Sequence, residues 1–213
     1  MHTNGGKACE GKESERITSK KRLMKKDIIL CGVGGQGILS IATIIGEAAT
    51  HAGINLKQAE MHGMSQRGGD VQSNLRLSTD VIYSDLIQKG GADIIISMEP
   101  MEALRYLPYL SKDGVIVTSN KPFVNIPNYP EEKDLFDELN ALPNKVVMLN
   151  IEDAAKEAGS ARSANVVLLG MAAKYIEIVS SDALRNAVAT IFARKGESVV
   201  EANLKAFDLG ASN

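Results

Sequence analysis

A glycine-rich turn after an apolar stretch of strand length is the feature that most constrains the fold of this chain. Residues 27–31 (DIILC) form the apolar stretch, and residues 32–37 (GVGGQG) match the pattern G-x-G-x-x-G and lead into a helical pattern. This order predicts the strand–turn–helix opening of a Rossmann-like sheet. Backbone N–H groups at the start of the helix would suit a phosphate, whereas a tight turn that binds nothing produces the same pattern.

A second glycine cluster departs from an ordinary dinucleotide-binding fold. Glu60 ends a predicted strand at residues 55–60 and lies 23 residues beyond Gly37, about where such folds place a ribose-binding acid. Residues 61–70 (MHGMSQRGGD) then hold three glycines with Ser, Gln and Arg between them, which predicts a loop in place of the second helix. Within this loop, Arg67 is a candidate for binding an anion or a partner, against the alternative of a solvated charge.

Composition places the chain among globular proteins. With 213 residues and 44% hydrophobic content it can bury one sizeable core, and no apolar run approaches the roughly 18 residues of a membrane span. We therefore expect a cytoplasmic protein without membrane contact. Its two cysteines and three histidines include no C-x-x-C pair or ligand cluster, so we expect the chain to hold no metal and no iron–sulfur cluster by itself. Cys31 fits a small apolar residue at the end of a buried strand.

Charge is unevenly spread along the sequence. Residues 1–26 carry eight Lys or Arg against three Glu, whereas the remainder carries 16 basic and 23 acidic residues. We expect residues 1–24 to be a disordered basic tail, because they lack aromatic residues and helical periodicity, and residues 25–210 to form a single α/β domain. The acidic remainder has no basic stripe, which argues against nucleic-acid binding.

From residue 25 onward, the apolar pattern alternates between strand and helix periods. It predicts strands at 27–31, 55–60, 71–77, 92–96, 114–118 and 145–150, helices at 36–51, 97–107 or 97–110, and 131–141, and a helical region from 152 to about 209. The alternation in 71–77 predicts a half-exposed edge or antiparallel strand, with 81–83 as its hairpin mate. Ser97 is the candidate N-cap of the helix that contains Pro100. The predicted fold class is α/β: an open, mainly parallel twisted sheet with helices on both faces and a helical C-terminal region.

Ligands of open α/β sheets bind beyond the carboxyl ends of the strands, so we expect the segments at those ends to line one crevice. The candidate cofactor-binding or crevice-lining residues are Gly32, Gly34, Gly35, Gln36, Gly37, Glu60, Ser65, Gln66, Arg67, Gly68, Glu99 and Asn120. No residue of this chain is predicted to be catalytic, and His62 is more typical of a hydrogen-bonded structural residue than of a base. Residues 163–175 are apolar nearly all round and predict central core or a buried subunit contact, with Asn165 bonded to a backbone partner.

Four segments in this order give the sequence a family resemblance. They are residues 32–38, the loop at 61–69, the helix start at 99–105 and the apolar helix at 163–173. Together they resemble the gamma-type subunit of 2-oxoacid:ferredoxin oxidoreductases over about residues 25–205. The segment HGMSQRGG (residues 62–69) most resembles the corresponding segment in the small (beta) subunit of indolepyruvate ferredoxin oxidoreductases.

The resemblance implies a subunit of a complex that oxidatively decarboxylates a 2-oxo acid on thiamine diphosphate, with indolepyruvate as the expected substrate. Electrons would pass through [4Fe-4S] clusters to ferredoxin, and coenzyme A would receive the acyl group. This chain has no G-D-G…N-N arrangement for thiamine diphosphate, so both cofactors are expected in a large catalytic partner subunit and none in this chain alone. Without the partner, the chain is expected to be inactive, with a homodimer as an alternative state.

Two other functions stay open. The chain could be a free-standing NAD-binding protein that uses Gly32, Gly34, Gly37 and Glu60, although the missing helix after Glu60 counts against this. It could also be a purely structural subunit that binds no ligand. Titration with NADH separates the first alternative from the others.

Overall fold

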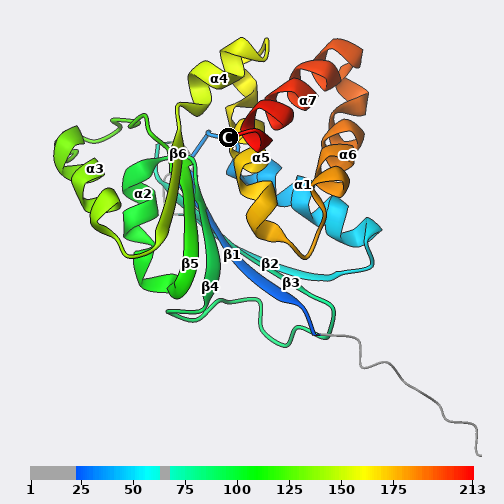
Figure 1. Ribbon diagram of the computed structural model, residues 1–213, viewed down its shortest axis with the longest axis horizontal. Coiled ribbons are helices and arrows are strands. Elements are labelled where there is room, and N and C mark those ends of the chain that lie inside the picture. Colours follow the sequence, from blue (N-terminus) through cyan, green and yellow to red (C-terminus); the bar gives the residue numbers. More distant parts are fainter. Residues whose placement is uncertain (1–22, 63–67) are drawn as a thin grey trace, which may run out of the picture.

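The predicted first strand is β1 (Lys25–Val33), and it lies in the middle of a six-stranded sheet (Figure 1). The computed structural model describes residues 23–62 and 68–213, and within these ranges the strand order is β2-β3-β1-β4-β5-β6. The other strands are β2 (Asn55–His62), β3 (Asp70–Ser78), β4 (Ala92–Ser97), β5 (Leu110–Ser119) and β6 (Lys145–Leu149). β1, β4, β5 and β6 pair in parallel, and β3 is antiparallel to both of its neighbours. The mainly parallel sheet is thus confirmed; residues 1–22 of the predicted tail lie outside the described ranges.

Helices cover both faces of the sheet, as the unbroken apolar strands predict. They are α1 (Ile38–His51), α2 (Pro100–Arg105), α3 (Glu132–Ala141), α4 (Ile151–Glu157), α5 (Ala164–Ile176), α6 (Ser181–Phe192) and α7 (Glu197–Ala211), with short 3-10 helices η1 (Leu107–Tyr109), η2 (Ala161–Ser163) and η3 (Ala193–Lys195). On β1, Ile28 and Leu30 join the larger core with α1 and α4 to α7, while Ile29 and Cys31 join the smaller core under α2 and α3. Figure 1 shows these two layers on opposite sides of the sheet. Cys31 is fully buried, which confirms its role as a small apolar residue.

β3 differs from its prediction because it is an interior strand and not an exposed edge. It lies between β1 and β2, and most of its residues are buried. Most of its polar side chains do not face water. Asn74 is 1% exposed, and its amide oxygen accepts a hydrogen bond from the backbone N–H of Ile87 (3.2 Å), in the loop before β4. The polar alternation therefore marks a strand face that a loop covers, while the predicted antiparallel direction is confirmed.

The predicted hairpin mate at residues 81–83 is wrong, since β2 pairs with β3 and no strand forms at 81–83. The side chain of Tyr83 is 91% exposed, so it contributes nothing to a packed strand. Arg76 holds this loop instead. Its Nη1 donates to the backbone carbonyls of Ser84 (3.0 Å) and Leu86 (3.2 Å). The Arg76 side chain thus holds this loop with hydrogen bonds to its backbone, where the prediction expected hydrogen bonds between two strands.

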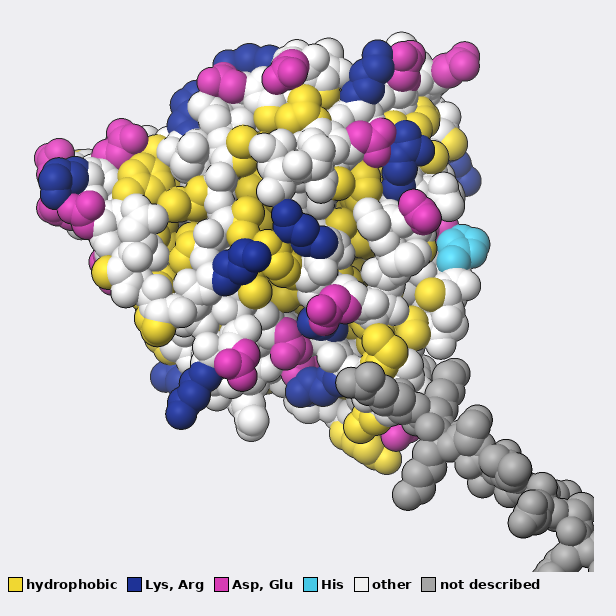
Figure 2. All heavy atoms as spheres, in the orientation of Figure 1, with side chains coloured by type: hydrophobic (Ala, Val, Ile, Leu, Met, Phe, Trp, Pro, Cys, Tyr) yellow, Lys and Arg dark blue, Asp and Glu magenta, His cyan; other side chains and the backbone are white. Residues whose placement is uncertain are grey.

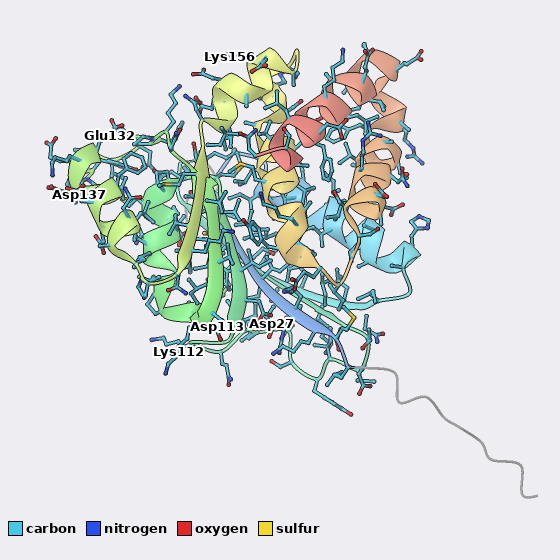
Figure 3. The ribbon with its side chains drawn as sticks, in the orientation of Figure 1. Asp27, Lys112, Asp113, Glu132, Asp137 and Lys156 are labelled. Carbon is cyan, nitrogen blue, oxygen red and sulfur yellow. The ribbon has the colours of Figure 1, made fainter. Side chains whose placement is uncertain are left out.

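A buried ion pair joins β1 to β3 at the amino end of β1. Asp27 is 1% exposed and lies opposite Arg76, whose Nε and Nη2 donate to its two carboxylate oxygens at 2.8 and 3.1 Å. Figure 3 shows Asp27 at the same end of the molecule as Lys112 and Asp113, far from Lys156. Because side chains alternate with a period of two, a one-residue slip would separate this pair and invert every side chain of the strand. The pair therefore specifies the β1–β3 register.

α2 begins with a different cap from the one predicted. Glu99, not Ser97, is the N-cap: its carboxylate accepts a hydrogen bond from the backbone N–H of Glu102 (3.0 Å), and Pro100 occupies the first helical position. The Ser97 hydroxyl donates instead to the carbonyl of Glu99 (2.5 Å). The helix ends at Arg105, earlier than predicted, and η1 follows it.

α5 forms the centre of the larger core. All of its residues from Ala164 to Ala173 are buried within the chain itself, which confirms the central-core alternative. The helix meets α7 backbone to backbone. A Cβ on Gly210 would lie 2.0 Å from the carbonyl oxygen of Val167, and a Cβ on Gly170 would lie 2.2 Å from that of Phe207. Only glycine permits so close an approach of the two helices.

Replacing Gly210 with Ala should therefore destabilise the protein, although alanine favours a helix. The added methyl would overlap the α5 backbone, and such overpacking costs about 1–3 kcal/mol or more, against about 1 kcal/mol gained in helix propensity. We expect the free energy of unfolding in urea to fall by about 2 kcal/mol.

Gly46→Ala is the matched control for this variant. Gly46 lies inside α1, and its Cβ would stand 3.6 Å from the Leu56 side chain, an ordinary contact. This variant should be as stable as the wild type, or up to about 1 kcal/mol more stable. Unchanged stability in Gly210→Ala would contradict the close approach of α5 and α7.

Candidate functional site

The two glycine clusters meet at the carboxyl end of β1. The backbone N–H of Gly34 donates to the carbonyl of Gly69 (2.8 Å), and the N–H of Gly68 donates to the carbonyl of Gly34 (3.3 Å). These bonds extend the antiparallel β1–β3 ladder past its last strand pair. The predicted site residues that lie outside the described ranges are Ser65, Gln66 and Arg67. Gly68, the residue that follows them in the sequence, lies beside the glycine turn of β1.

Backbone packing explains the glycines of the first turn. The N–H of Gln36 donates to the carbonyl of Val33 (3.1 Å), and the N–H of Val33 donates to the Gln36 side chain (2.8 Å). Gly35 and Gly37 have φ values of 104° and 86°, which side chains rarely adopt. At Gly37 a Cβ would also lie 2.8 Å from the Asn165 amide nitrogen. The turn thus requires glycine without a ligand, and phosphate binding to its backbone stays a prediction.

The predicted crevice residues occupy different surroundings. One pocket of about 450 Å³ is lined by Val33, Gly34, Gly35, Gly37, Ile38, Leu39, Glu60 and Val71, so the structure does bring Glu60 to the glycine turn. Glu60 is exposed, and its carboxylate accepts a hydrogen bond from Gln58 (2.7 Å). Asn120 is exposed at the end of β5, where its backbone N–H donates to the carbonyl of Leu149 (3.0 Å), and it does not line this pocket.

Glu99 lies beneath the surface and not on it. It is completely buried, and besides capping α2 it accepts hydrogen bonds from the Tyr129 hydroxyl and from the backbone N–H of Phe123 (3.4 Å). These contacts connect the end of β4 to the loop after β5. From its buried position, Glu99 therefore holds together the segments around the crevice. Its position in the sequence did not reveal this role.

A second group of acids, one buried and one half-buried, was missed in the sequence and adjoins Glu99. Glu102 is 2% exposed, and Arg105 donates to both of its carboxylate oxygens (2.7 and 3.2 Å). The nearby Asp70 accepts from the Tyr106 hydroxyl (2.5 Å). Burial raises the pKa of Glu102 to about 7; Arg105 opposes this shift and the charge of Asp70 adds to it. Glu102 can thus carry a proton near neutral pH, close to the start of β3.

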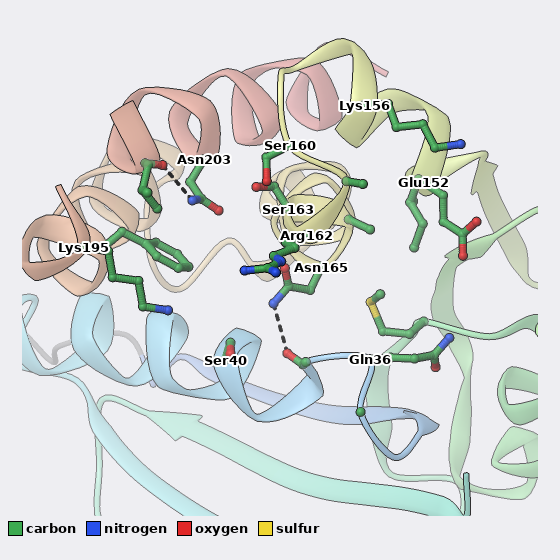
Figure 4. Close-up of a pocket in the computed structure, with 18 of the residues that line it drawn as sticks. Gln36, Ser40, Glu152, Lys156, Ser160, Arg162, Ser163, Asn165, Lys195 and Asn203 are labelled. Carbon is green, nitrogen blue, oxygen red and sulfur yellow. Dashed lines mark hydrogen bonds between the residues drawn. The ribbon is translucent and has the colours of Figure 1, made fainter. Parts of the chain in front are cut away.

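A larger pocket, of about 630 Å³, lies on the helical side of the glycine turn (Figure 4). Its lining comes from the turn, from Met98 and Phe123, and from α1, α4, η2, α5, the end of α6, η3 and α7. Figure 4 shows Arg162 and Lys195 pointing into it, and the Asn165 amide donates to the carbonyl of Gly37 at its floor (3.1 Å). The predicted backbone partner of Asn165 is thus confirmed. The sequence carried one signal for this pocket, namely Arg162 and Asn165 at the start of an otherwise apolar helix.

The chemistry of these residues is suited to binding an anion or a partner. Within residues 23–62 and 68–213, no group of three or more His, Cys, Asp or Glu side chains is placed to hold a metal ion. Burial raises the pKa of the Cys31 thiol, which makes it a poor nucleophile. Glycine turns, a cationic pocket and buried acids can together orient an anion or seat a partner.

Comparison with known proteins matches nearly the whole described chain. Residues 27–213 match the profile of the family described as pyruvate ferredoxin/flavodoxin oxidoreductase. The chain is 35% identical over 193 residues to indolepyruvate oxidoreductase subunit IorB of Archaeoglobus fulgidus, covering 88% of this chain and 94% of the relative. It is 36% identical over 195 residues to the protein of the same name from Pyrococcus horikoshii, covering 86% and 93%.

Solved structures show the same architecture. The gamma subunit of keto/oxoacid ferredoxin oxidoreductase from Geobacter sulfurreducens is 27% identical, with a TM-score of 0.66 over 88% of this chain and 96% of that one. The 2-oxoglutarate:ferredoxin oxidoreductase from Magnetococcus marinus, at 24% identity, shows the fold alone, with a TM-score of 0.70 over 88% of this chain and 30% of that chain.

The raised pKa of Glu102 makes stability depend on pH. Below about pH 4.5 the carboxyl is protonated in both folded and unfolded chains; from there to about pH 7 the unfolded chain loses the proton while the folded chain keeps it. The free energy of unfolding should therefore fall as pH rises through this window. Relative to Glu102→Gln, which has no such proton, the wild type should lose roughly 1–3 kcal/mol between pH 5 and 8.

Urea unfolding at several pH values measures this difference, with Glu138→Gln as the control. Glu138 is an exposed glutamate on α3, so its variant should follow the wild-type curve at every pH. Wild-type and Glu102→Gln curves that stay parallel from pH 5 to 8 would contradict the assignment.

Proposed function

The chain belongs to the pyruvate ferredoxin/flavodoxin oxidoreductase family, and we propose that it is the small, gamma-type subunit of a 2-oxoacid:ferredoxin oxidoreductase. The observation that carries this proposal is the set of relatives named indolepyruvate oxidoreductase subunit IorB, which are 35–38% identical to the chain. Relatives named 2-oxoglutarate synthase subunit KorC are 26–27% identical. The higher identity supports indolepyruvate as the 2-oxo acid.

The proposed complex divides its chemistry between subunits. A 2-oxo acid would lose carbon dioxide, its acyl group would pass to coenzyme A, and the two electrons released would reduce ferredoxin, with [4Fe-4S] clusters of the partner subunit as their carriers. Thiamine diphosphate, held by the partner subunit, would supply the electron sink for decarboxylation. With two cysteines and no G-D-G…N-N arrangement in its sequence, this chain fits neither cluster ligation nor a thiamine diphosphate site, so we assign both cofactors to a large partner subunit. The complex that we propose works in the cytoplasm, and no helix in the described ranges has the length and apolar character to cross a bilayer.

The role of this chain would be to shape the crevice and to hold the partner. Leu39 and Phe123, each beside one of the two pockets, are 41% and 44% exposed, and the neighbouring Val124 is 70% exposed. Figure 2 shows further hydrophobic side chains gathered in the middle of one face, over β6 and the space towards α5. Exposed apolar surface of this kind supports the proposal that the chain buries it against another subunit.

Copurification tests the proposal. This chain, tagged and produced together with a partner that carries thiamine-type and ferredoxin-type motifs, should yield a complex that contains iron and reduces ferredoxin when given indolepyruvate and coenzyme A. The chain produced alone should be colourless and inactive. Oxidation of a 2-oxo acid by the chain alone, or failure of the two chains to copurify, would contradict the proposal.

Arg67→Ala in the same complex tests the glycine loop. An arginine among glycines is poorly placed to build a core and well placed to meet an anion or a partner acid. Loss of one charge-assisted contact costs about 1.5–3 kcal/mol, so kcat/KM or partner affinity should fall roughly ten- to a hundredfold while thermal unfolding barely moves. Lys112→Ala, at the far end of the sheet, is the control and should change neither. If Arg67→Ala also changes neither quantity, Arg67 is an ordinary solvated charge.

A further inference from the structure

We propose that the outer edge of β6 pairs with the same edge of a second copy of this chain, which joins the two sheets across a two-fold axis at Val147. This pairing does not require the partner subunit proposed above. The backbone of β6, the side chains along it and the charges near its two ends support it.

The backbone of β6 is open on one side. β6 is the last strand of the sheet, and no other strand within the described ranges lies beside its outer edge (Figure 1). The carbonyl of Leu149 accepts a hydrogen bond from the backbone N–H of Asn120 (3.0 Å), which continues the parallel ladder with β5. Because the backbone groups of successive residues point to opposite sides of a strand, Val146 and Met148 direct their N–H and C=O groups outward. These groups form a template for a further strand.

The side chains of β6 are not those of a strand that faces water. An exposed edge normally carries charged residues that prevent its pairing with another chain. Here Lys145 is the single charged residue of the strand, and the residues after it are apolar and half-buried. Val147 and Leu149 pack against the larger core, and Val146 and Met148 pack against the smaller one. Figure 2 shows hydrophobic side chains gathered over β6, so this edge is suited to being covered.

β2, the strand at the other edge of the sheet, is protected by polar side chains. It exposes Lys57, Gln58 and Glu60 to water. Charged side chains along an edge oppose its pairing with another chain, because their burial would cost free energy. The two edges of one sheet therefore differ, and β6 is the edge that is suited to pairing.

A second copy in the antiparallel direction matches the outward groups of β6. Val146 of one copy would lie opposite Met148 of the other, and these residues would exchange N–H···O=C hydrogen bonds in both directions. The two-fold axis then passes beside Val147, whose two copies face each other as a pair without hydrogen bonds between them. Apolar side chains meet on both faces of the joined sheet, and symmetry makes every contact occur twice.

The charges near the two ends of β6 are complementary under this symmetry. Lys145 and Lys174 lie 5.1 and 5.5 Å from the centroid of the Tyr175 ring, and neither contacts a carboxylate of a described residue. Beyond the other end of β6, Glu152 and Asp153 begin α4 with exposed carboxylates, although each also contacts a lysine of its own chain. In an antiparallel pair the start of β6 in one copy lies beside its end in the other, so the lysines approach the acids. This complementarity favours a second copy over a strand of different charge.

Analytical ultracentrifugation of the full chain, produced without other subunits, measures the pairing. We expect a monomer–dimer equilibrium at micromolar concentration. Val146→Pro removes an outward N–H and leaves the ladder with β5 intact, since proline is tolerated on an edge strand. Each dimer then loses two hydrogen bonds, so its dissociation constant should rise roughly ten- to a hundredfold. Lys145→Glu, which keeps the backbone of the strand, should raise the constant roughly threefold or more.

Tyr83→Ser is the matched control for these variants. The side chain of Tyr83 is 91% exposed in the loop before β4, so this change removes more exposed apolar surface than either variant of β6. If the chain associates through β6, the dissociation constant of this control should equal that of the wild type. Melting temperatures of Lys145→Glu and Tyr83→Ser should also match the wild type.

A cysteine at the two-fold axis tests the register of the pair. Opposite residues in an antiparallel pair without hydrogen bonds have Cα atoms about 4.5 Å apart, which a disulfide can bridge. In a Cys9→Ser background, Val147→Cys should form a disulfide-linked dimer on mild oxidation with copper–phenanthroline. Val146→Cys in the same background is the control, because its two copies would lie diagonally, roughly 8 Å apart, beyond the reach of a disulfide.

Four results would overturn the proposal. A chain that stays monomeric at high micromolar concentration has no such pairing, and a dimer that Val146→Pro and Lys145→Glu leave unchanged has its contact elsewhere. Cross-linking of Val146→Cys as fast as Val147→Cys contradicts the register. β6 amides that become protected from hydrogen exchange only in the copurified complex would assign this edge to a strand of the partner subunit. If the complex fails to form while Val147→Cys cross-links as described, the pairing still stands.

Discussion

The antiparallel pairing of β1 with β3 is the interaction on which the site depends. In a dinucleotide-binding unit the strand after the first helix pairs in parallel with the first strand and leads into a second helix. Here β2 turns back through a hairpin, and β3 inserts between β2 and β1. The insertion returns the chain to the carboxyl end of β1, where Gly34 bonds to Gly68 and Gly69. At the other end of β1, the buried pair of Asp27 and Arg76 specifies the register that makes this meeting possible.

The same pairing counts against a free-standing NAD-binding protein. The N–H of Gly34 is already bonded to the protein, and β2 continues past Glu60 into a strand hairpin where a cofactor-binding unit would have a helix. On the opposite side of the turn, α5 packs so closely on α7 that glycine is needed on both helices. This packing sets the first turn of α5 beside the start of α1, and the larger pocket lies there. The glycine turn thus lies between the 450 Å³ pocket and the 630 Å³ pocket and lines both of them.

Structural features that depend on residues close together in the sequence could be predicted. The buried strands and the apolar helix α5 carry their patterns in consecutive residues, and the glycines at 35 and 37 require positive φ for local reasons. The interior position of β3 could not be predicted, because a polar alternation looks the same whether water or the loop at Ile87 covers it. The cap of α2 depends on Glu99 being buried under Tyr129, thirty residues away. Arg162 and Lys195 are also distant in sequence, and only the packing of the C-terminal helices brings them to one pocket.

We propose that the carboxyl edge of this sheet faces a cofactor-bearing partner. Hydrogen–deuterium exchange tests it most directly, by comparing the chain alone with the chain in its purified complex. The account predicts slower exchange in the complex at residues 34–39 and 120–125, with little change in the loop at 79–91 at the opposite edge. Slower exchange confined to residues 79–91, with the glycine turn unchanged, would contradict it.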